Sequence, residues 1–121
     1  MFKICSNEVY MKLAIIGSRG IKNIQLEKYI TSDVTEIVSG GALGVDSVAR
    51  EYAKANGLFL VEFLPKYKMY GKGAPLIRNK EIVNYADKVI AFWDGQSKGT
   101  KFVIEYAEKI NKPCEVVICN L

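Results

Sequence analysis

Short apolar runs, each stopped by glycine or another turn former, divide this sequence into alternating segments. Runs rich in β-branched residues and only four to seven residues long are typical of strands buried on both faces of a sheet. They predict five strands, at residues 12–16 (KLAII), 35–39 (TEIVS), 58–64 (LFLVEFL), 88–93 (KVIAFW) and 114–119 (CEVVIC).

The segments between these runs carry apolar residues at helical spacing. The clearest stripe starts at Val45 and continues at i+3, i+4, i+7 and i+8, ending at Ala53 before an Asn-Gly pair. Similar spacing predicts helices with apolar positions over residues 24–30, 76–86 and 103–110. Residues 65–73 (PKYKMYGKG) have no clear period, so we predict a loop over the strand ends.

Alternating strands and helices predict an α/β fold. We expect a single Rossmann-like three-layer domain, with a mainly parallel sheet of about five strands and right-handed crossovers covering both faces. A chain of 121 residues, half of them hydrophobic, suits one core. The domain is assigned to residues 11–121, because Met11 directly opens the first strand. Residues 1–10 are interpreted as a short N-terminal extension or a start-site artefact.

Composition limits the chemistry available to this chain. Histidine is absent, which removes the usual general base near neutral pH and the commonest neutral metal ligand. Cys5, Cys114 and Cys119 form no CxxC pair and are odd in number, so we expect reduced thiols rather than disulfides or a zinc site. No metal or other cofactor is predicted.

Charge and hydropathy narrow the range of partners. The formal net charge of +4 suits an anionic ligand but is ordinary for a soluble domain. No apolar run approaches the roughly 18 residues of a spanning helix, and no secretory signal opens the chain. We therefore expect a cytoplasmic protein without a membrane partner.

Three glycine-bearing loops follow predicted strands. They are residues 17–20 (GSRG), 40–46 (GGALGVD) and 95–100 (GQSKGT). In a parallel sheet such loops gather at the carboxyl ends of the strands, where ligands bind. Glycine lets the backbone approach an anion, and the following helix offers unpaired N–H groups. The first loop matches neither GxGxxG nor a P-loop, so generic NAD or ATP chemistry is not indicated.

The candidate ligand-binding residues come from these loops and from the helix before the fourth strand. They are Gly17, Ser18, Arg19, Gly40, Gly41, Ala42, Gly44, Asp46, Arg78, Asn79, Ser97, Lys98, Gly99 and Thr100. Hydroxyls supply donors, and the basic side chains neutralise phosphate charge. Each loop taken alone is also compatible with a plain strand-to-helix turn.

Two of these candidates have alternative roles. Arg78 and Asn79 are predicted to begin a helix, where a guanidinium either contacts phosphate or carboxylate in a bidentate manner or simply faces solvent. Asp46 lies in the first turn of its helix, where it either stabilises the helix dipole or accepts a hydrogen bond from a ribose hydroxyl. Trp93 and the tyrosines of residues 66–72 either stack on a base or pack against the protein.

Four motifs, in this order and spacing, resemble the SLOG superfamily. They are residues 14–19 (AIIGSR), 39–46 (SGGALGVD), 77–80 (IRNK) and 97–100 (SKGT), and the resemblance covers about residues 11–119. The superfamily joins the DNA-processing protein A (Smf) group, the Lonely Guy phosphoribohydrolases, and small stand-alone domains related to YspA and YpsA. This chain most resembles the stand-alone domains.

The resemblance implies a Rossmann-like sheet that binds nucleotides or senses nucleotide-derived signals such as ADP-ribose relatives, often as a homodimer or larger homo-oligomer. Lonely Guy enzymes carry a PGGxGTxxE motif with a catalytic glutamate. Gly99 and Thr100 align with it, but Val103 occupies the glutamate position. Glu105 comes two residues later, about 200° around a helix.

Three functional hypotheses follow. The first is a sensor or sequestering module for a phosphate-bearing nucleotide or nucleotide-derived signal. The second is an N-glycosidic phosphoribohydrolase, with Asp46 or Asp94 as its carboxylate and Arg78 as electrostatic partner. The third is single-stranded DNA binding, motivated by the positive charge and by the tyrosines interleaved with lysines at residues 66–72.

Overall fold

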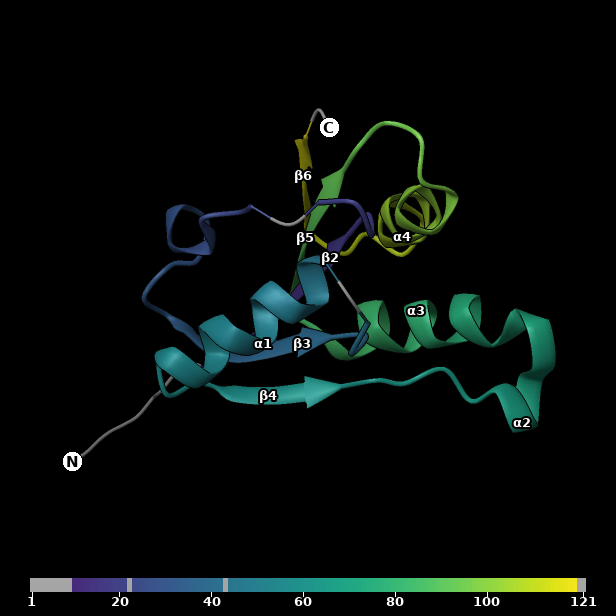
Figure 1. Cartoon of the computed structure of the whole chain (residues 1–121), viewed down its shortest axis with the longest axis horizontal. Helices are drawn as coiled ribbons and strands as arrows, with labels where there is room; N and C mark the ends of the chain where they lie inside the picture. The colour runs from purple at the N-terminus through teal and green to yellow at the C-terminus, as the bar shows by residue number, and fades with distance from the viewer. Residues whose placement is uncertain (1–9, 22, 43, 120–121) are drawn as a thin grey trace.

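The computed structural model describes residues 10–21, 23–42 and 44–119. Residues 1–9 of the predicted extension, with Cys5, and Leu43 of the second glycine loop lie outside the described residues. Within the described ranges the chain forms one five-stranded, all-parallel sheet with long helices packed against it (Figure 1). The predicted α/β, Rossmann-like fold class is confirmed.

The strands follow the predicted apolar runs closely. They are β2 (Met11–Gly17), β3 (Val34–Ser39), β4 (Phe59–Glu62), β5 (Lys88–Trp93) and β6 (Cys114–Ile118). Their order across the sheet is β4-β3-β2-β5-β6, which Figure 1 shows from bottom to top. The chain therefore builds outward from β2 to β4, then returns to the other side of β2 to add β5 and β6.

Helices cover the two faces of this sheet. One face is covered by α1 (Val45–Ala55) and by the short 3₁₀ turn η1 (Leu26–Lys28). The other is covered by α3 (Ala74–Tyr85) and α4 (Lys98–Lys109). The connections after β2 and β5 therefore leave the sheet on opposite faces, which opens a crevice between the two strand ends.

Strand β2 shows how the sequence supplies two cores at once. Successive side chains of a strand point to opposite faces. Leu13 and Ile15 pack on the α1 side, whereas Ala14 and Ile16 pack on the side of α3 and α4. All four are buried. The continuous apolar run that predicted this strand is thus explained by its central position.

The predicted helix over residues 24–30 is wrong. The structure has only η1 there, and Gln25 at its start makes no side-chain capping hydrogen bond. The apolar residues instead pack one by one on the sheet: Leu26 is buried, and the ring of Tyr29 meets that of Phe92 edge-on at 5.2 Å. A helix of seven residues gains too few hydrogen bonds to hold against such packing.

The predicted loop over residues 65–73 is also partly wrong. It contains the one-turn helix α2 (Tyr67–Tyr70) and the 3₁₀ turn η2 (Gly71–Gly73), which lead directly into α3. Pro75 lies in the first turn of α3, where a missing N–H costs nothing. The helix therefore begins at Ala74. Arg78 lies in its second turn, so the prediction that Arg78 and Asn79 begin the helix is wrong.

Matched phenylalanines test which part of the sheet carries stability. Phe92 on β5 is 1% exposed, whereas Phe59 on the edge strand β4 is 70% exposed. We expect Phe92→Ala to lower the free energy of unfolding by about 3–5 kcal/mol, because it leaves a cavity beside Tyr29. Phe59→Ala should cost less than about 1 kcal/mol. Guanidinium chloride denaturation measures both, and equal losses would contradict this assignment of the core.

Candidate functional site

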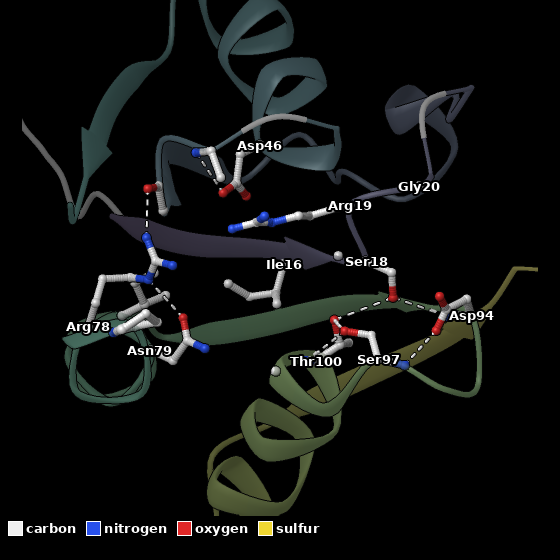
Figure 2. Close-up of a pocket in the computed structure, with 16 residues that line it drawn as sticks. Ile16, Ser18, Arg19, Gly20, Asp46, Arg78, Asn79, Asp94, Ser97 and Thr100 are labelled. Atoms are coloured by element: carbon white, nitrogen blue, oxygen red, sulfur yellow. Dashed lines mark hydrogen bonds between the residues drawn. The ribbon is translucent and has the colours of Figure 1, made fainter. Parts of the chain in front are cut away.

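A pocket of about 410 Å³ opens at the carboxyl ends of β2 and β5, where the strand order reverses (Figure 2). The loops after β2, β3 and β5 line it, together with α3. The predicted candidates that line this pocket are Gly17, Ser18, Arg19, Gly40, Ala42, Asp46, Arg78, Asn79, Ser97, Gly99 and Thr100. Their role in binding a ligand stays a prediction.

Three predicted candidates are absent from the lining that the described residues form. Gly41 and Gly44 have positive φ angles of 68° and 75°, so they shape the second loop. A Cβ on Gly44 would lie 2.6 Å from the carbonyl oxygen of Arg19, which shows that Gly44 lets the first two loops touch. Lys98 is the exposed first residue of α4.

The lining also contains residues that were not among the ligand-binding candidates: Ile16, Gly20, Pro75, Ile82 and Asp94. Asp94 was predicted only as a possible carboxylate of the phosphoribohydrolase hypothesis. Ile16 and Ile82 had none: both are buried, and an apolar floor looks like any core position in the sequence.

Two buried hydroxyls form one end of the pocket. Ser18 and Thr100 are each 2% exposed, and their side-chain oxygens lie 3.5 Å apart. The Asp94 N–H donates to Ser18 Oγ at 3.3 Å. Ser97 caps α4 by accepting from the Thr100 N–H at 3.4 Å, and its hydroxyl donates to Thr100 Oγ1 at 3.3 Å. These polar groups meet at the first turn of α4, where backbone N–H groups lack helical partners.

The turn between β5 and α4 is held by its own hydrogen bonds. Asp94 Oδ1 accepts from the N–H groups of Gln96 and Ser97, at 2.9 and 2.8 Å. These two bonds hold the pKa of Asp94 below its ordinary value. The Trp93 ring N–H donates to the Ser97 carbonyl at 3.0 Å. Trp93 and Asp94 therefore fix the N-terminus of α4 toward the pocket.

Arg78 braces the opposite end. Its Nη1 donates to the carbonyl of Gly40 at 2.8 Å and to that of Phe63 at 3.2 Å, and its Nε donates to Asn79 Oδ1 at 2.9 Å. Burial lowers the pKa of Arg78, and the charge of Asp46 opposes that shift. A guanidinium nonetheless keeps its charge in proteins. The side chain joins the segments after β3 and β4, and its Nη2 makes no hydrogen bond to any residue that the structure describes.

Asp46 lies beside Arg78 with Gly40 next to both. Its Oδ2 accepts from the Ala42 N–H at 3.0 Å. Burial raises the pKa of Asp46, and the Ala42 hydrogen bond and the Arg78 charge oppose the rise. A Cβ on Gly40 would lie 2.7 Å from Arg78 Nη1 and 3.1 Å from Asp46 Oδ2. Only glycine fits at this position without displacing one of them.

Charges within the pocket balance in number but not in placement. Arg19 and Arg78 oppose Asp46 and Asp94. Figure 2 shows the Arg19 side chain lying across the pocket between Asp46 and Ile16, while the hydroxyls gather at the other end. Both hydrogen bonds that Asp94 accepts go to Oδ1. The hydroxyl end therefore combines hydroxyls and helix N–H groups, which can donate to an anion, with one carboxylate.

The catalytic glutamate position of the Lonely Guy motif carries no acid here. Val103 is fully buried in the core under α4, and Glu105 is exposed and absent from the pocket lining. Of the described residues, only Asp46 and Asp94 bring carboxylates to the pocket.

In the part of the chain that the structure describes, no helix has the length and apolarity needed to cross a bilayer. Residues 10–21, 23–42 and 44–119 also bring together no group of three acidic, cysteine or histidine side chains able to hold a metal ion.

The fold and the pocket define a Rossmann-like α/β domain with its candidate site at the strand-order reversal. Neither a protein-family model nor a curated protein matches the sequence. A solved structure does: this chain is similar to DNA processing protein A from Helicobacter pylori, with 26% sequence identity and a TM-score of 0.67. The match covers 92% of this chain and 66% of that one.

The likeness supports the SLOG resemblance that the four motifs predicted. The chain has the architecture of a SLOG-type Rossmann-like domain. The structure of the Helicobacter protein is described in terms of a single-stranded DNA binding mode. This chain spans about two thirds of the length of that protein.

Two glycines of the pocket allow a direct test of its packing. A Cβ on Gly17 would lie 2.2 Å from Val45 Cγ2, whereas a Cβ on Gly99 would meet nothing within 4 Å. We expect Gly17→Ala to destabilise the fold by about 1–3 kcal/mol, because Val45 at the start of α1 must shift. Gly99→Ala should stabilise α4 by up to about 1 kcal/mol. Chemical denaturation checks both, and a neutral Gly17→Ala would refute the close approach.

Proposed function

We propose that this protein binds a phosphate-bearing nucleotide or nucleotide-derived signal, such as an ADP-ribose relative, as a sensor or sequestering module. The observation that carries the proposal is the buried hydroxyl pair of Ser18 and Thr100 at the N-terminus of α4, inside a pocket at the strand-order reversal. Hydroxyl donors beside a helix N-terminus favour a phosphate group. The phosphate is assigned to this end.

The dimensions and charges of the pocket support the same ligand class. A volume of about 410 Å³ lies within the range of small-molecule sites. Arg19 lies across the pocket, and Arg78 borders its far end. Both guanidiniums are permanent charges that recognise phosphate or carboxylate oxygens. A nucleotide with its phosphate at the hydroxyl end would place its sugar toward Arg78.

Binding without turnover is the better supported form of this function. Glycosidic cleavage at phosphoribohydrolase sites uses a carboxylate directed at the sugar. Here the position of the Lonely Guy glutamate is filled by the buried Val103 instead. The homo-oligomer and the cytoplasmic location remain predictions from the sequence. Light scattering tests the first, and fractionation of cells tests the second.

Thermal unfolding with nucleotides tests the proposal. We expect one of AMP, ADP-ribose or cyclic ADP-ribose to raise Tm by several degrees at about 100 times its Kd, because a ligand of the folded state adds about 2.7 kcal/mol there. Thr100→Val removes a pocket hydroxyl and should weaken binding about tenfold or more. Thr31→Val makes the same change on an exposed turn before β3 and should leave the affinity for the nucleotide unchanged.

The same mixtures, analysed for free base, separate binding from hydrolysis. Stabilisation without base release supports the module. Release of base that Asp46→Asn abolishes would favour the phosphoribohydrolase instead. No stabilisation by any of the three nucleotides would contradict the proposal.

Single-stranded DNA binding is the second candidate, favoured by the likeness to DNA processing protein A. Exposed Tyr67 and Tyr70 and the lysines of residues 66–72 lie just before α3, whose Arg78 borders the pocket. If DNA is the ligand, the affinity for an oligodeoxythymidylate will fall steeply as salt rises. We expect the oligonucleotide to bind weakly, and we expect AMP not to displace it. Tight, salt-sensitive binding that needs Thr100 would make DNA the ligand.

A further inference from the structure

The two ends of the pocket differ in their hydrogen-bonding character. Ser18, Ser97 and Thr100 gather at one end, together with the N-terminus of α4. At the other end lies Asp46, a half-buried carboxylate in the first turn of α1 (Figure 2). An ionised carboxylate only accepts hydrogen bonds. A ligand that spans the pocket therefore meets hydroxyl and N–H donors at one end, and at the other the Asp46 acceptor beside the Arg78 guanidinium.

Asp46 has accepting capacity that its surroundings do not use. Its Oδ2 is bound by the Ala42 N–H at 3.0 Å. The Gly40 backbone N–H also helps to lower the pKa of Asp46, but among the described residues no bond of ordinary length and angle reaches Oδ1, and no described cation lies within ion-pair distance. Arg78 directs its Nη1 to two backbone carbonyls instead. Because Asp46 is half-buried and lines the pocket, a ligand that donates to it takes the place of water there.

The Asp46 charge also decides which part of a ligand lies beside it. Phosphate oxygens are acceptors and carry negative charge, so the carboxylate repels them. Asp94 at the hydroxyl end is also negative, but two backbone N–H groups donate to it and the N-terminus of α4 lies beside it, so the phosphate is placed at that end. The group covalently next to the phosphate of a nucleotide is its sugar, and the vicinal hydroxyls of ribose are hydrogen-bond donors. Deoxyribose lacks one of them.

We propose that Asp46 accepts hydrogen bonds from the ribose hydroxyls of the bound nucleotide, so that the pocket selects ribonucleotides over deoxyribonucleotides. This inference rests on the proposed nucleotide-binding function. It gives Asp46 a role in specificity besides its hydrogen bond to the Ala42 N–H, which helps to hold the second glycine loop. It also separates this protein in ligand class from a binder of single-stranded DNA.

An exocyclic amino group of the base is the other donor that a nucleotide could bring to Asp46. The connectivity favours the sugar, because it lies between the phosphate and the base. The two donors are separable by ligand choice: 2′-deoxy-AMP lacks the 2′-hydroxyl and keeps the amine, whereas IMP keeps both hydroxyls and lacks the amine.

Titration calorimetry of the full chain with AMP, 2′-deoxy-AMP and IMP tests the inference. We expect AMP and IMP to bind with similar affinity and about tenfold or more tightly than 2′-deoxy-AMP, as befits a hydrogen bond to a charged group. Asp46→Asn should reduce that preference to less than about threefold, while its amide oxygen still accepts from Ala42. Glu51→Gln makes the same change on the exposed side of α1 and should keep the preference.

Each outcome bears on one of the two claims. Equal affinity of the unchanged protein for AMP and 2′-deoxy-AMP overturns the ribose inference without using any variant, and nucleotide binding itself then stands. A preference that survives Asp46→Asn, or a loss of affinity for IMP alone, also overturns it. If AMP, 2′-deoxy-AMP, IMP and ADP-ribose all fail to bind, the proposed function itself fails.

Discussion

The parallel pairing of β2 with β3 on one side and β5 on the other determines where the candidate groups of this protein lie. Because the chain returns across β2 before forming β5, the connections after these strands depart on opposite faces of the sheet. Ser18 and Thr100 therefore meet at the crevice, although one follows the first described strand and the other precedes the last. Pocket, hydroxyls and helix N-terminus all follow from this one reversal.

A second constraint is the close contact between backbone and side chains around Gly40. Arg78 reaches from α3 to the carbonyls that follow β3 and β4, and a charged group so placed loses much of its hydration. The hydrogen bonds to carbonyls and the neighbouring Asp46 offset that loss. The arginine thus ties together the segments that immediately follow the last paired residues, Ser39 and Glu62. A lysine, with a compact ammonium group, would not reproduce this geometry.

Much of this architecture could be predicted from the sequence, because buried parallel strands produce continuous apolar runs and their loops need glycine. The helix expected over residues 24–30 failed for a physical reason: its apolar residues face a sheet that accepts them singly, and periodicity cannot distinguish that case. The sequence identified Arg78 as a candidate ligand-binding residue, but its hydrogen bonds to two distant backbone carbonyls could not be predicted from it. Its acceptors, Gly40 and Phe63, are backbone carbonyls 38 and 15 residues away.

The contact between Ser18 and Thr100 spans 82 residues of the chain. During synthesis, Ser18 in the first glycine loop therefore has no partner until Thr100 has been added, when about five-sixths of the described chain has been made. Across small proteins, contacts between residues this distant in sequence go with slower folding. A nascent or truncated chain that ends before α4 has the first two glycine loops but cannot complete the pocket. A closed pocket is consequently a marker of a finished fold.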